Sequence, residues 1–109
     1  MQILVWLSYD LGVRGDYTGL YEWLDDHKAK ECGNSVAFFK YDIDEDRTSD
    51  FSKNLKDDIE NKVEFKKHDR IYIMFKDAQK KIKGTFLFGK RKSSPWKGYG
   101  GTDEEEIDE

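Results

Sequence analysis

Residues 1–10, Met-Gln-Ile-Leu-Val-Trp-Leu-Ser-Tyr-Asp, decide the fold. Successive side chains of an extended strand point to opposite faces of a sheet, so Ile3, Val5 and Leu7 share one face. Leu4 and Trp6 share the other face. Apolar residues on both faces predict a strand that is covered on both sides, at least at its start. A sheet built around this strand therefore needs a cover on each face.

Two helices are expected between the strands. Asp16 is a good N-cap for a first helix over residues 17–27, whose apolar side chains recur three and four residues apart: Tyr17, Leu20, Tyr21 and Leu24. Gly19 should weaken this helix by about 1 kcal/mol relative to alanine. Thr48 or Ser49 is expected to cap a second helix, whose buried face carries Phe51, Leu55 and Ile59.

Three further segments, residues 35–41, 70–76 and 82–88, are predicted to be strands because they are short and rich in apolar or aromatic residues. The last two should pair as a hairpin around a turn at residues 77–81. The order is then strand, helix, strand, helix, strand, strand. This order predicts an α+β, ferredoxin-like two-layer sandwich, in which a four-stranded sheet carries both helices on one face.

The second face of such a sheet would be bare, although apolar residues supply both faces: Leu4, Trp6, Val36 or Ala37, and Ile71 or Tyr72. A sheet of this size cannot leave that surface in water, so we expect a homodimer in which two sheets pack face to face. The alternative is a monomer whose C-terminal segment folds over the open face.

Length and composition limit the class of protein. The chain has 109 residues, of which 39% are charged and 15% aromatic, as in a single globular domain. Its longest apolar run, residues 3–7, is far shorter than the roughly 20 residues that span a bilayer. No signal peptide is evident, and the single Cys32 forbids an internal disulfide. We therefore expect a cytoplasmic protein without membrane contact.

Charge changes sign twice along the chain. Residues 1–61 carry a net charge of −7, residues 62–97 carry +9, and residues 98–109 carry −6. A basic stretch beside aromatic residues indicates an electrostatic footprint for nucleic acid, and a solvated surface balanced by acidic neighbours explains the same charges equally well. We expect three segments: a ferredoxin-like domain over 1–90, a Ser/Pro/Gly-rich aromatic extension over 91–101, and a disordered acidic tail over 102–109.

The stretch Ser8-Tyr9-Asp10-Leu11 resembles the opening of SinR-like proteins and of small CRISPR-associated adaptation nucleases, where an apolar strand ends in Tyr-Asp. The likeness continues in Asp16-Tyr17, in Leu20-Tyr21-Glu22, and in residues 35–39 and 69–73. Virulence-associated protein D ribonucleases are relatives with the same fold. The resemblance covers residues 1–88 and does not account for residues 94–101 or the acidic tail.

The resemblance implies a ferredoxin-like homodimer that acts on or holds nucleic acid. In the adaptation nucleases, the aspartate that ends the first strand lies near the two-fold axis and is proposed to ligate a divalent metal; here that position is Asp10. Two copies of Asp10 holding Mg²⁺ or Mn²⁺ would neutralise a phosphate and lower the pKa of a bound water. Asp10 is therefore the candidate catalytic and metal-ligating residue. Without the resemblance, the aspartate at position 10 is explained as a cap on the turn at residues 12–15.

The candidate nucleic-acid-binding residues are basic or aromatic. Arg14 lies in the turn Gly12-Val13-Arg14-Gly15, which precedes a helix and would place backbone N–H groups beside a phosphate, although a plain turn also explains it. Single strands bind to positive charge along their backbone and to rings that stack on their bases. Both occur together near the end of the chain, at Lys83, Lys90, Arg91, Lys92, Trp96, Lys97 and Tyr99.

These patterns predict a nucleic-acid-binding dimer for RNA or DNA, with divalent-metal-dependent endonuclease activity through Asp10 as its possible reaction. The alternative is a non-catalytic protein-interaction module of a defence or toxin–antitoxin system. That module would dock a protein partner through the aromatic residues Trp96 and Tyr99.

Overall fold

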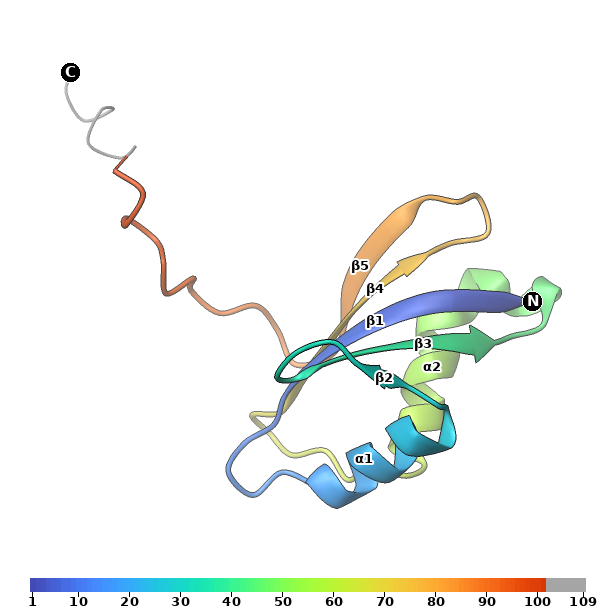
Figure 1. Cartoon of the computed structure of the whole chain (residues 1–109), viewed down its shortest axis with the longest axis horizontal. Helices are drawn as coiled ribbons and strands as arrows, with labels where there is room; N and C mark the ends of the chain where they lie inside the picture. Colours follow the sequence, from blue (N-terminus) through green and yellow to red (C-terminus); the bar gives the residue numbers. More distant parts are fainter. Residues whose placement is uncertain (102–109) are drawn as a thin grey trace.

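A computed structural model describes residues 1–101; the expected acidic tail lies outside the described residues. Within the described chain, one antiparallel sheet has the strand order β2-β3-β1-β4-β5 (Figure 1). The strands are β1 (Gln2–Asp10), β2 (Lys30–Glu31), β3 (Val36–Asp42), β4 (Arg70–Lys76) and β5 (Ile82–Phe88). The helices are α1 (Tyr17–Asp26), the short 3₁₀ helix η1 (Glu45–Asp50) and α2 (Phe51–Glu60).

The opening stretch forms the central strand, as its sequence favours. Ile3, Val5 and Leu7 are at most 3% exposed, and Val5 lies opposite Phe39 of β3 and Phe75 of β4. Because side chains alternate along each strand, these residues all point to the same face of the sheet. This face carries the core.

Both helices cover that face. Trp23 of α1 meets Phe39 edge-on, with ring centroids 5.3 Å apart, and Phe51 of α2 packs on Phe75 at 4.7 Å. Leu20 in α1 and Leu55 in α2 are fully buried. The two helices and the sheet thus form two layers, and no helix within residues 1–101 lies on the second face of the sheet.

A carboxylate joins the two helices to the sheet. Asp58 of α2 accepts a hydrogen bond from the hydroxyl of Tyr41 at 2.6 Å and one from the indole N–H of Trp23 at 3.4 Å. The imidazole of His27 stacks on Trp23, and its two nitrogens face the carbonyl of Trp23 and the carboxylate of Asp58. This cluster ties α1, α2 and β3 together.

The α+β class, the first helix, and the hairpin of residues 70–88 are confirmed. The expected four-stranded sheet is wrong, because β2 adds a fifth strand. A strand of two residues is too short to show the alternation of apolar and polar side chains by which strands are predicted. The capping role of Thr48 and Ser49 is also wrong: both lie inside η1, and α2 follows directly at Phe51. No helix between residues 1 and 101 is long and apolar enough to cross a bilayer.

Candidate nucleic-acid interface

The face of the sheet without helices, called here the open face, exposes large apolar side chains. Trp6 is 44% exposed and Met74 is 45% exposed, and the two lie opposite each other on β1 and β4. Phe38 of β3 lies on the other side of Trp6, with ring centroids 5.1 Å apart. The start of β1 is therefore apolar on both faces, as expected, but within one chain only the helix-facing side is covered.

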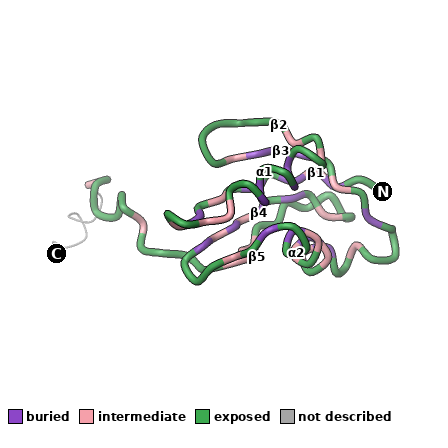
Figure 2. Tube along the Cα trace, turned by 90° about the horizontal axis from the view of Figure 1, so that it is seen from below, coloured by how far each residue is buried: buried purple, intermediate pink, exposed green. Residues whose placement is uncertain are grey.

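The C-terminal extension does not provide the missing cover. Residues 91–101 are almost wholly exposed and run away from the sheet in two perpendicular views (Figures 1 and 2). The alternative of a monomer whose C-terminal segment folds over the open face is therefore wrong for the described residues, except at Arg91. The physical reason is composition: glycine, serine and lysine dominate this segment and give it few apolar contacts to make with the sheet.

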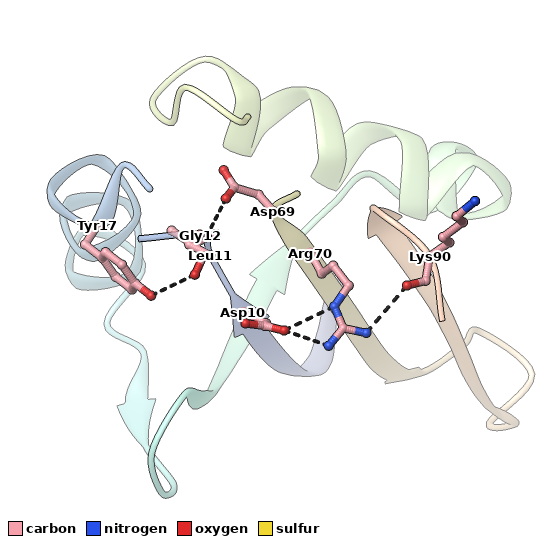
Figure 3. Close-up of polar contacts among 7 residues, drawn as sticks. All are labelled: Asp10, Leu11, Gly12, Tyr17, Asp69, Arg70 and Lys90. Carbon is pink, nitrogen blue, oxygen red and sulfur yellow. Dashed lines mark hydrogen bonds and ion pairs between the residues drawn. The ribbon is translucent and has the colours of Figure 1, made fainter. Parts of the chain in front are cut away.

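Asp10 lies at one end of the open face and is held by Arg70, its cross-strand neighbour (Figure 3). Nη2 and Nε of Arg70 both donate to the same oxygen, Oδ2, at 2.6 and 3.2 Å. The side chain of Asp10 is 55% exposed and that of Arg70 is 25% exposed. No residue within 1–101 donates a hydrogen bond to the second oxygen, Oδ1, which is thus free to accept one from a ligand.

A buried carboxylate, missed by the sequence prediction, holds this end of the sheet in place. Asp69 is 3% exposed and accepts a hydrogen bond from the backbone N–H of Gly12 at 2.7 Å (Figure 3). The backbone N–H of Lys66 also donates to it, at 2.8 Å. It thereby joins the chain leaving β1 to the chain entering β4. The signal in the sequence was an aspartate immediately before an apolar strand, which predicts only a turn.

A hollow of about 210 Å³ opens beside Asp10 on the open face. Its floor and walls come from β1, β4, β5 and the start of the extension: Ser8, Asp10, Arg70, Tyr72, Phe86 and Arg91. The rings of Tyr72 and Phe86 lie 4.7 Å apart in an edge-on pair. The guanidinium of Arg91 sits over both rings, 5.7 and 5.5 Å from their centroids. Two aromatic rings and two arginines thus surround one small space.

Tyr72 keeps its place because Gly84, its neighbour on β5, has no side chain. A Cβ at Gly84 would collide with the hydroxyl of Tyr72 and come within 3.0 Å of its ring. The glycine in β5 therefore gives the tyrosine ring room to lie across the sheet.

The remaining predicted residues lie at different places. Trp96 is 71% exposed and Tyr99 is 86% exposed in the extension, where Lys92 and Lys97 also lie, and Lys90 comes just before it. The structure does not bring these two rings to the hollow. Arg14 is exposed in the loop that follows β1, at the Asp10 end of the sheet. Lys83 lies near the start of β5, at the opposite end, and its amine is 3.1 Å from the carboxylate of Asp77.

One copy of the chain offers a magnesium or manganese ion one free carboxylate oxygen at Asp10. Both ions take several oxygen ligands, and Asp10 has only Oδ1 to offer because Arg70 occupies Oδ2. Among residues 1–101, no three carboxylate, histidine or cysteine side chains gather in a way that would hold a metal. Asp10 of a second copy would add a second carboxylate to such a site.

No family model, curated protein or solved structure matches this chain. The resemblance to SinR-like and CRISPR-associated adaptation proteins therefore stays a prediction.

Proposed function

We propose that the protein binds single-stranded nucleic acid, with the hollow beside Asp10 and the basic extension as its contact surface. The observation that carries this proposal is the hollow itself, where Tyr72 and Phe86 lie under Arg91 and beside Arg70. Rings and guanidinium planes stack on unpaired bases, and the arginine charges attract the phosphates.

The extension that starts at the hollow supports the same function. Lys90 lies just before the extension and Lys92 and Lys97 lie within it, and Trp96 and Tyr99 expose their rings near them. A strand whose base enters the hollow would continue along this segment. The net charge of +9 over residues 62–97 supplies the long-range attraction.

Salt-dependent binding of a labelled single strand tests the proposal. Affinity for an oligomer of about nine nucleotides should fall by at least tenfold between about 50 and about 200 mM salt, because counterions are released when basic side chains neutralise phosphates. Arg91→Ala should weaken binding about fivefold or more. Arg47→Ala, which removes an arginine from η1 on the far side of the molecule, is the matched control and should change little.

Two results would overturn the proposal: no measurable binding at low salt, or equal binding by wild type, Arg91→Ala and Arg47→Ala. In the first case, the protein-interaction module that docks through Trp96 and Tyr99 becomes the better account of the extension.

The finer fold assignment is also a proposal. Without β5, the chain order is strand, helix, strand, strand, helix, strand, with β1 between β3 and β4. This order supports a ferredoxin-like fold in which β2 is reduced to two residues and β5 is added at the edge.

Metal-dependent cleavage by Asp10 is a separate proposal, which rests on the family resemblance and on a homodimer. Wild-type protein should then cleave RNA or DNA with Mg²⁺ or Mn²⁺, and Asp10→Asn should abolish cleavage while leaving the dimer intact. If purified protein cleaves neither substrate with either ion, the endonuclease is excluded and the binding function stands.

A further inference from the structure

We propose that Asp10 and Arg70 read the edge of the base that enters the hollow and that they select cytosine over uracil. This inference rests on the proposed function, since it names the base that the binding surface prefers. Oδ1 is the oxygen of Asp10 that Arg70 does not contact, and the inference has it accept from a base, so Asp10 is assigned a role other than cleavage.

The ion pair supplies both an acceptor and donors to the hollow that it lines. Nε and Nη2 of Arg70 both donate to Oδ2 of Asp10, so the lone pairs of Oδ1 can accept a hydrogen bond from a ligand. Nη1 of Arg70 reaches only a distant partner, the carbonyl of Lys90 at 3.5 Å. A guanidinium has five N–H donors in a fixed plane, so Arg70 keeps N–H groups that do not donate to Asp10.

This pattern is complementary to cytosine. Cytosine presents an amino group, N4, as donor and the adjacent ring nitrogen, N3, as acceptor, and a carboxylate accepting from N4 is an established mode of base reading. Uracil in the same position reverses both groups: its O4 would face the carboxylate oxygen and its N3–H would face the guanidinium. Two acceptors would then face each other at O4, and two donors would face each other at N3.

The residues around Asp10 and Arg70 hold this ion pair in place and leave room for one planar base. Asp69 fixes the ends of β1 and β4 that carry Asp10 and Arg70. The rings of Tyr72 and Phe86, with Arg91 above them, leave a space of about 210 Å³. A pyrimidine stacked there would present its edge to the pair.

Affinities for oligomers of deoxycytidine and deoxyuridine, each about nine nucleotides long, test the inference. The two differ only at C4 and N3 of each base, so ring size and backbone charge are matched. Wild-type protein should bind the deoxycytidine oligomer about fivefold or more tightly. In Asp10→Asn, the amide oxygen stays on Arg70 and its NH₂ replaces Oδ1, so the preference should vanish or reverse.

Asp42→Asn is the control, because it removes the same charge from the far end of the open face, where Asp42 lies opposite Gln2. Either variant can raise overall affinity by removing a negative charge, but only Asp10→Asn should change the ratio of the two affinities. A thermal melt of each variant checks its fold.

Equal binding of both oligomers by wild type would overturn the inference and leave the proposed function standing. An unchanged ratio in Asp10→Asn would also overturn it. Failure to bind either oligomer would instead contradict the proposed function.

Discussion

At the scale of single residues, Gly19 has the opposite effect from the one that helix propensity predicts. The propensity scale treats it as a weak point in α1. In the structure, a Cβ at this position would lie 2.7 Å from the carbonyl oxygen of Lys62 and would also collide with the carboxylate of Asp16. The first turn of α1 packs directly on the chain that leaves α2, and only glycine permits this approach.

Gly19→Ala should therefore destabilise the protein by about 1–3 kcal/mol, because backbone must move to admit the methyl group. The free energy of unfolding in urea measures the effect. Gly100→Ala is the control, since no atom of the described residues lies within 4 Å of a Cβ there. A Gly19→Ala variant as stable as wild type or more so would mean that helix propensity outweighs the close contact.

Asp16 makes the stability depend on pH. The backbone N–H groups of Glu64 and Gly19 donate to its carboxylate, both at 2.9 Å, and hold the pKa of Asp16 below its usual value. A lowered folded pKa adds stability above the unfolded pKa of about 3.9, and this stability is lost as the pH falls through the folded value.

The melting temperature of wild type should accordingly exceed that of Asp16→Asn most clearly near pH 6. The gap should shrink as the pH falls below about 4. Thermal melts followed by circular dichroism over this range measure it. A gap that stays constant from about pH 6 to about pH 2 would show that the charge of Asp16 contributes nothing.

At the scale of elements, the functional end of the sheet depends on one connection between two strands. The carboxylate of Asp69 accepts hydrogen bonds from backbone N–H groups of the segment that leaves β1 and of the segment that enters β4. Asp69 is buried. The strands themselves pair from Val5 with Phe75 to Asp10 with Arg70. Asp69 thus fixes the backbone just beyond the last strand pair, and this keeps Asp10 and Arg70 in contact.

Asp69→Ala should destabilise the fold by about 2–4 kcal/mol, because it leaves two backbone donors without a partner in a buried place. Urea denaturation measures the loss, and Asp46→Ala, in the exposed helix η1, should change stability little. Equal stabilities of the two variants would show that water replaces the carboxylate of Asp69 without cost.

At the scale of the whole molecule, the open face remains to be accounted for. Trp6 and Met74 expose nearly half of their surface at the middle of the sheet, on the side that neither helix nor extension covers. A solvent-exposed apolar patch of this kind is typical of an interaction site. We propose that two copies bury it against each other, as expected from the alternation in residues 1–10.

Sedimentation at micromolar concentration should then show a dimer for wild type and a monomer for Trp6→Glu, because a carboxylate in the contact would be buried without a partner. Tyr21→Glu places the same charge on exposed α1 and should leave the dimer intact. If wild type sediments as single chains, the open face has a different occupant, and nucleic acid would cover the rings of Trp6 and Phe38 as well.

Much of the fold could be predicted because period and spacing are local properties. Val5 and Leu7 alternate with Leu4 and Trp6, and Phe51, Leu55 and Ile59 recur every four residues, so the central strand and the helix face follow directly. The strand β2 could not be predicted in this way, because its two residues pair with β3 only once the hairpin has formed.

The sequence by itself determined the four longer strands and the faces that are apolar, and it showed that residues 62–97 are basic and contain several aromatic residues. Only the tertiary structure decided which of the basic and aromatic residues meet. Strand register placed Arg70 beside Asp10 and Tyr72 beside Phe86, and it left Lys83 at the other end of the sheet and Trp96 in solvent. The reason is that cross-strand neighbours are set by long-range pairing, which joins residues 60 positions apart and leaves no local trace in the chain.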